Sequence, residues 1–168
     1  MRPPLDSGTV LILGACSCLG REIARQLSRR ARTVVLVAPE LGPLEALRAE
    51  LEARNPTLGV ILLLCDVSRP GEVGEVLAEL LRQFVTVDEL VNASATQEGA
   101  LFARQRWGEI ERMLLANVLT PLLLARRLIG PMMARGRGGI LHIGSGAGQL
   151  FLPGAATFAA TQRCLDGF

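Results

Sequence analysis

Residues 9–20 read TVLILGACSCLG and set the pattern for the rest of the chain. The first five of them, Thr9–Leu13, are apolar or β-branched without alternation, which is typical of a strand buried on both faces of a parallel sheet. The run stops at Gly14, and apolar residues at helical spacing follow from Leu19. A strand that turns through glycine into a helix is typical of the opening unit of a doubly wound α/β fold.

Strand-like and helix-like patterns alternate along the remaining chain, and we find no linker, repeat or low-complexity tract. Because this alternation favours a parallel sheet with helices on both faces, we predict one α/β domain over residues 1–168 with a doubly wound sheet of about five strands. Strands are expected at residues 9–13, 33–37, 58–65, 88–92 and 139–144, and helices at 19–30, 43–55, 70–84, 107–135 and 155–168.

Two local features are expected to shape the helices. Ser68 precedes Pro70 and is placed to cap the third helix, since Ser is favoured at the N-cap and Pro in the first turn. Pro121 lies inside the longest helical pattern, so we expect a kink there.

Composition excludes several classes of protein. Hydrophobic residues make up 49% and charged residues 20% of the 168, which is enough apolar surface for a core and excludes a disordered tail or a disulfide-framework miniprotein. The net charge of +2 lacks the basic excess of a nucleic-acid-binding protein. The chain has no Tyr, and all its basic residues are Arg. A mechanism that needs a phenol or an ammonium group cannot run on this chain alone.

The sequence gives an expectation about compartment. The N-terminus lacks the apolar region of a signal peptide, and the longest near-continuous apolar run, Val60–Cys65, is too short to span a bilayer. We therefore expect a cytoplasmic protein without a membrane partner. The cysteines are dispersed and the chain has one histidine, so we expect free thiols and no metal site. They are Cys16, Cys18, Cys65 and Cys164.

The glycine turn indicates a nucleotide site. Between Gly14 and Gly20, free backbone N–H groups at a helix N-terminus are suited to hold the pyrophosphate of a dinucleotide. The alternative is structural: Gly14 ends a strand and Gly20 allows close helix packing.

This turn and several motifs downstream resemble the short-chain dehydrogenase/reductase family, whose turn is TGxxxGxG. Gly14 and Gly20 match it, whereas Leu13 stands in place of the Thr. Cys18 replaces the middle Gly, and its side chain either crowds the cofactor or turns away from it. The matching segments downstream are Asp66-Val67, Asn92 in LVNASA, Asn117-Val118, Ile143-Gly144-Ser145, Pro153-Gly154 and Leu165–Phe168.

The resemblance implies a Rossmann-type fold without the family's last strands, an NAD(P) cofactor and a small carbonyl or alcohol ligand. It also implies a homo- or hetero-oligomer with a family relative. Ser145 resembles the catalytic serine, and Asn117 resembles the residue that orders a water near the catalytic lysine. The implied cofactor-binding residues are Gly14, Ser17, Cys18, Leu19, Gly20, Asp66, Val67 and Asn92.

Two residues of the family's active-site motif are replaced. YxxxK is expected to begin 13 residues after Ser145, where Phe158 stands, with Gln162 four residues later. In the family the Tyr is the general acid and the Lys lowers its pKa. Phe offers no transferable proton and Gln no positive charge, so we expect an impaired or inactive hydride-transfer site.

Three functions stay open at this stage. The first is a scaffold that binds a nucleotide with little or no turnover. The second is a working oxidoreductase with another proton donor, such as a water held by Ser145 and Asn117. The third is a non-enzymatic interaction or regulatory subunit. His142 lies three residues before Ser145, so strand alternation favours packing over catalysis for it.

In dinucleotide-binding folds, the residues just after the second strand distinguish NAD from NADP. Glu40 is placed to bind the ribose hydroxyls of NAD. Pro39 occupies the position where the NADP-preferring pattern has Arg. We therefore favour NAD over NADP. The alternative is that Glu40 is a solvated loop residue without a role in binding.

Overall fold

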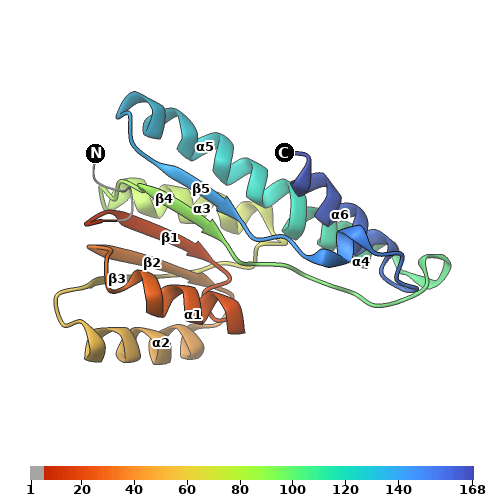
Figure 1. Cartoon of the computed structure of the whole chain (residues 1–168), viewed down its shortest axis with the longest axis horizontal. Helices are drawn as coiled ribbons and strands as arrows, with labels where there is room; N and C mark the ends of the chain where they lie inside the picture. The colour runs from red at the N-terminus through yellow and green to blue at the C-terminus, as the bar shows by residue number, and fades with distance from the viewer. Residues whose placement is uncertain (1–5) are drawn as a thin grey trace.

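The computed structural model describes residues 6–168. The first five residues, where we expect no signal peptide, lie outside the described residues. The described part contains one parallel sheet of five strands in the order β3-β2-β1-β4-β5 (Figure 1). The strands are β1 (Thr9–Leu13), β2 (Thr33–Ala38), β3 (Gly59–Leu64), β4 (Glu89–Asn92) and β5 (Gly139–His142).

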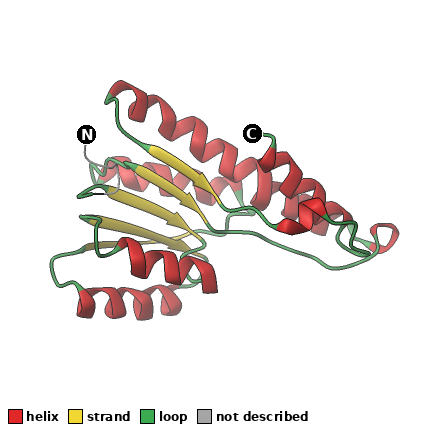
Figure 2. Cartoon of the chain, in the orientation of Figure 1, coloured by secondary structure: helices red, strands yellow, loops and turns green. Residues whose placement is uncertain are grey.

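Helices cover both faces of this sheet, as Figure 2 shows. Helices α1 (Cys18–Leu27) and α2 (Leu41–Arg54) lie on one face of the sheet. Helices α3 (Pro70–Arg82) and α5 (Thr120–Ala134) lie on the other face. The predicted Rossmann-type doubly wound fold is therefore confirmed. The helices are α1 (Cys18–Leu27), α2 (Leu41–Arg54), α3 (Pro70–Arg82), α4 (Trp107–Leu114), α5 (Thr120–Ala134) and α6 (Ala156–Asp166), with a π-helical turn at Leu115–Leu119 and 3-10 turns at Phe102–Arg104 and Gly146–Gln149.

The uninterrupted apolar character of β1 is explained by burial on two sides. Val10 and Ile12 pack toward α1 and α2, whereas Leu11 and Leu13 pack in the second core toward α3 and α5. All five residues of the strand are buried. The strand therefore needs apolar side chains at every position, which is why its sequence does not alternate.

The strand order reverses at β1, which pairs with β2 on one side and β4 on the other. In this register Leu13 lies opposite Val37 in β2 and opposite Asn92 in β4. The carboxyl ends of the three strands thus meet at one edge of the sheet, where open α/β folds bind their ligands.

The helix ends differ from two expectations. Ser68 does not cap α3: the N-cap is Arg69, and the Ser68 hydroxyl donates instead to Asp66 Oδ1 at 2.7 Å. The irregularity expected at Pro121 lies one turn earlier, in the π-helical turn. In an ordinary α-helix the Pro121 ring would clash with the carbonyl group four residues earlier, at Asn117. The helix therefore widens into a π-helical turn there.

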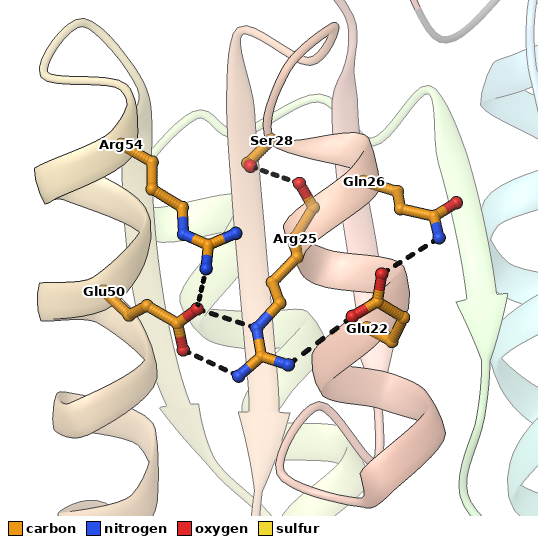
Figure 3. Close-up of polar contacts among 6 residues, drawn as sticks. All are labelled: Glu22, Arg25, Gln26, Ser28, Glu50 and Arg54. Atoms are coloured by element: carbon orange, nitrogen blue, oxygen red, sulfur yellow. Dashed lines mark hydrogen bonds and ion pairs between the residues drawn. The ribbon is translucent and has the colours of Figure 1, made fainter.

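An ion-pair network fixes α1 beside α2 (Figure 3). Arg25 donates from Nε and Nη2 to the two carboxylate oxygens of Glu50, at 2.7 and 3.0 Å. Glu22 and Arg54 extend the network on either side. Hydrogen bonds from Arg25 hold the pKa of the Glu50 carboxyl below its usual value. The network thus ties the helix that follows the glycine turn to the helix that follows β2.

The continuous helical stretch Trp107–Ala134 is long and apolar enough to cross a membrane by length and composition alone. Its α5 part lies along the sheet, as Figure 1 shows, and 44% of the most apolar window of the stretch is buried. Leu124 and Met132 belong to the core between this stretch and the sheet. Its apolar composition therefore has a packing role.

Candidate functional site

A cavity of about 770 Å³ lies at the carboxyl ends of the central strands. Its walls come from four places: the glycine turn with the start of α1, the end of β2 with the start of α2, the end of β3, and the loop after β4. Most of the residues assigned to cofactor binding from the sequence line this one cavity, and Gly20 and Asn92 do not. Those that line it are Gly14, Ser17, Cys18, Leu19, Glu40, Asp66 and Val67.

The two glycines of the turn are required by packing. Gly14 has φ +69°, and a Cβ there would lie 2.8 Å from the Ala93 carbonyl oxygen and from the Ser94 backbone. A Cβ at Gly20 would collide with the Gly14 carbonyl oxygen. Both positions therefore need glycine whether or not a nucleotide binds. Their presence alone does not distinguish a binding site from a folded scaffold.

The start of α1 offers free hydrogen-bond donors to the cavity. The N-cap Ser17 accepts through Oγ from the amide of Gly20 at 2.9 Å. The amides of Cys18 and Leu19 donate to no described residue. Since the first turn of α1 carries no acidic side chain, these two N–H groups and the helix dipole are available to an anion.

Cys18, which the sequence resemblance sets against the family's middle glycine, is exposed and lines the cavity. Cys16 and Cys65 line it too, and all three are free thiols. Burial raises the pKa of the Cys65 thiol to about 11, so that thiol is inert at neutral pH. The side chain of Cys18 thus adds bulk where the family's glycine adds none.

The loop after β3 is held by its own hydrogen bonds. The Asp66 carboxylate accepts from the amide and the hydroxyl of Ser68, at 2.9 and 2.7 Å. Burial opposes ionisation of Asp66, but these hydrogen bonds and the Arg69 charge hold its pKa below the usual value. The Thr120 hydroxyl donates to the Val67 carbonyl oxygen at 2.7 Å, which ties the loop to α5.

Asn92 ends β4 beneath the cavity and does not line it. Its Oδ1 accepts from the amide and the hydroxyl of Ser94, and its fully buried Nδ2 has no hydrogen-bond partner. Residues 93–96, directly after it, form the cavity wall. Asn92 therefore shapes the loop that a nucleotide would contact.

The residues assigned to catalysis do not line this cavity. Ser145 is exposed and caps the 3-10 turn, with Oγ accepting from the amide of Ala147 at 3.2 Å. Phe158 and Gln162 on α6 are 5% and 1% exposed. Gln162 packs against Gly148, and its Oε1 faces Gly144. Both α6 side chains are therefore buried in the chain as it is folded here.

Asn117 is buried in the π-helical turn with its amide group engaged. Its Oδ1 accepts from the amide of Thr96, and its Nδ2 donates to the carbonyl oxygen of Thr96 and to Thr161 Oγ1. Both donors of Nδ2 are thus taken. This leaves no N–H of Asn117 with which to hold a water against Ser145.

His142 lies on β5, and both of its ring nitrogens are buried without a hydrogen-bond partner. Its ring packs edge-on against Phe168, 5.9 Å between centroids. Burial lowers the pKa of the imidazole. The environment is that of a packed, neutral side chain.

Sequence reasoning missed Arg21, which lines the cavity one residue after Gly20. Its Nε is buried and has no hydrogen-bond partner. No signal in the sequence marks it, because an Arg in the first turn of a helix has the same pattern as a solvated residue.

The pattern that defines the short chain dehydrogenase family matches residues 8–168. The chain belongs to this family.

The chain is 31% identical to dehydrogenase/reductase SDR family member 7B of Bos taurus, over 100% of this chain and 53% of that protein. A metagenomic short-chain oxidoreductase solved in complex with NADP is 28% identical, with a TM-score of 0.89 over 98% of this chain and 74% of that one. A short-chain dehydrogenase from Sphingobium yanoikuyae in complex with NADPH is 30% identical, with a TM-score of 0.86 over 94% and 60%. The chain spans between about half and two thirds of the length of the curated relatives it matches.

Proposed function

We propose that this protein binds a nicotinamide dinucleotide in the cavity at the strand ends and carries out little or no hydride transfer. The proposal is supported most by the motif spacing, which assigns Phe158 and Gln162 to the positions of the family's Tyr and Lys. The observation beside it is that both side chains are buried, 5% and 1% exposed. The cofactor half of the site is kept while the proton-donating half is replaced by inert side chains.

The chemistry of carbonyl reduction explains the loss. When hydride reaches the carbonyl carbon, the oxygen needs a proton from a group within hydrogen-bond reach. Phe158 has none to give, and Gln162 has no charge to stabilise an alkoxide. Removing a positioned proton donor slows such reactions by about 10²–10⁴-fold. Ser145 keeps a hydroxyl, which is a poor acid.

The start of α1 supports binding of the pyrophosphate. Two free amides and an uncompensated helix N-terminus form the kind of anion site that dinucleotides use. Cys18 opposes binding, because its side chain stands where a glycine would allow close approach. The expected affinity is therefore reduced rather than absent.

The proposal covers both NAD and NADP. The Glu40 carboxylate favours the 2′-hydroxyl of NAD. Two similar solved proteins hold NADPH and NADP, which favours the phosphorylated cofactor. A small carbonyl or alcohol ligand beside the cofactor, and a cytoplasmic location, belong to the same proposal.

A working oxidoreductase would need a different proton donor. A water between Ser145 and Asn117 has no support from the contacts of Asn117, whose two N–H donors are engaged. A role as a subunit that binds a family relative has better support. Large apolar side chains are exposed around α4 and α6, namely Phe102, Trp107 and Phe151.

Calorimetric titration with NAD and NADP tests the binding half of the proposal. Saturable binding of either supports it, and binding of neither would leave a bare scaffold or an interaction subunit.

The catalytic half is tested by restoring the motif with Phe158→Tyr and Gln162→Lys in one variant. We expect carbonyl-dependent oxidation of NADPH or NADH to rise above that of the unmodified chain. The matched control is Phe151→Tyr with Gln149→Lys, since both of these residues are exposed near α6. An equal rise in the control variant would contradict the assignment of Phe158 and Gln162 to the positions of the family's Tyr and Lys.

A further inference from the structure

A second cavity, of about 330 Å³, lies between α3 and α5, the two helices that share one face of the sheet in Figure 1. Thr86 and Val87 line it just before β4 begins at Glu89, so it lies near the amino ends of the strands. No residue that lines this α3–α5 cavity also lines the cavity at the carboxyl ends. Its ligand chemistry is therefore independent of dinucleotide binding.

The walls of the α3–α5 cavity are mainly apolar. Leu80 is 4% exposed, whereas Leu81 beside it is 76% exposed, so the apolar lining extends from the core to a side chain in contact with water. A hydrocarbon chain in the cavity would remove this surface from water, which is favourable. The apolar lining residues include Leu77, Leu80, Leu81, Val85, Leu128 and Pro131.

Two guanidinium groups, those of Arg127 and Arg135, line the same cavity, and none of its described lining residues is Asp or Glu. Arg135 is engaged: its Nη2 donates to the Val87 carbonyl oxygen at 2.9 Å and lies 3.7 Å from Asp88 Oδ1. Arg127 makes no hydrogen bond or ion pair with any residue in the range 6–168. Its own helix supplies no partner, since residues 113–165 contain no Asp or Glu. Arg127 is thus an exposed cation beside an apolar wall, without an anion to pair with.

We propose that the α3–α5 cavity binds a free alkyl carboxylate, with the carboxylate on Arg127 and the hydrocarbon chain against the apolar wall. A guanidinium binds a carboxylate through two parallel N–H···O bonds, and one free cation balances one negative charge. The charge of Arg135 at the C-cap of α5 offsets the negative end of that helix, which would otherwise repel the anion. The volume of about 330 Å³ is in the range of small-molecule sites, so a single small ligand fills it.

The test compares ligands that share a chain or a head group. Octanoate, 1-octanol and octylammonium carry the same chain with a negative, a neutral and a positive head, and acetate carries the carboxylate alone. Each is titrated calorimetrically, below the concentration at which it forms micelles, into the full chain and into Arg127→Gln. The matched control is Arg126→Gln, because Arg126 is the exposed neighbour on α5, forms no ion pair with a described residue and does not line the cavity.

We expect octanoate to bind about tenfold more tightly than 1-octanol, the size of a charged hydrogen bond, and octylammonium and acetate to bind more weakly than octanoate. Arg127→Gln should weaken octanoate binding about tenfold and change 1-octanol binding less than about threefold, whereas Arg126→Gln should change neither. Leu81→Gln should weaken octanoate and 1-octanol alike, because it removes an apolar lining residue. Its control is Leu150→Gln, at an exposed leucine that does not line the cavity.

Equal affinity for octanoate and 1-octanol would overturn the proposal, as would equal losses in Arg127→Gln and Arg126→Gln or no binding of octanoate. Self-association of the unmodified chain that Leu81→Gln abolishes, measured by sedimentation velocity without ligand, would also overturn it, because a second copy would then fill the cavity. So would co-sedimentation with anionic phospholipid vesicles that is lost in Arg127→Gln, because the surface would then belong to a membrane. Thermal unfolding of each variant confirms that it is folded.

Discussion

Asn117 holds Thr96 by two hydrogen bonds of 2.8 Å, accepting from its amide and donating to its carbonyl oxygen. This pair joins the π-helical turn to the loop that forms one wall of the cavity. A third bond, to Thr161, brings in α6. Asn117, which resembles the family's water-ordering Asn, thus has a structural role here, as the junction between the cavity and α6.

Replacing Asn117 should therefore reduce stability first. Asn117→Ala leaves the amide and carbonyl of Thr96 without partners, so we expect a loss of about 3 kcal/mol in the free energy of unfolding. Urea denaturation measures it. Gln97→Ala, at an exposed neighbour of Thr96, is the control and should change stability by less than about 0.5 kcal/mol. An unchanged midpoint for Asn117→Ala would contradict this role.

A methyl group added at Gly20 should destabilise the folded chain, because the glycine turn has no room for it. Gly20→Ala drives a Cβ into the Gly14 carbonyl, and overpacking of this kind destabilises by about 1–3 kcal/mol. The matched control is Gly74→Ala in α3, where a Cβ meets nothing within 4 Å. Alanine there should raise stability by up to about 1 kcal/mol, since it is the better helix former. Equal effects of the two variants would mean that Gly20 is not constrained by packing.

Cys18 should limit nucleotide affinity. Cys18→Gly restores the smaller residue beside the two free amides of α1, and we expect about tenfold tighter binding of the preferred dinucleotide, equivalent to ~1.4 kcal/mol. Calorimetry measures the change. Cys164→Ala removes another exposed thiol, away from the cavity, and should leave affinity unchanged. Weaker binding in Cys18→Gly would mean that the thiol contributes to the site.

His142 should make stability depend on pH. Burial lowers its pKa in the folded chain, so the unfolded chain takes up a proton first, near its pKa of about 6.5. Stability is then complete above about pH 7 and falls as the pH drops through this range, by at most about 1.4 kcal/mol per pH unit.

His142→Leu should remove that part of the slope between about pH 7 and 5.5, where the chain has no other histidine to titrate. Denaturation midpoints across this range measure the slope. The same slope in both proteins would contradict a buried neutral imidazole.

The strand pattern could be predicted from the sequence because the central strands are buried on both faces. Thr9–Leu13 was predicted to the residue, since each position needs an apolar or β-branched side chain. The helix ends were harder. Ser68 has the right side chain for a cap, but the Asp66 carboxylate two residues earlier competes for its hydroxyl.

The candidate site could be predicted where it depends on the backbone. Gly14, Ser17 and Cys18 follow from the turn between a strand and a helix, and they line one cavity. Arg21 was missed because a helical Arg after the turn has the same pattern as a solvated residue. Only the packing around its Nε distinguishes the two. The burial of Gln162 was equally hidden, since it depends on Gly148 approaching α6 closely.

The loss of hydride transfer is best tested by following the oxidation of NADPH and NADH by the unmodified, purified chain with a panel of aldehydes and ketones. We expect binding of a reduced cofactor without carbonyl-dependent oxidation above the background rate. Rapid oxidation that disappears in Ser145→Ala would contradict it, because a proton donor other than the missing Tyr would then be at work beside the cofactor.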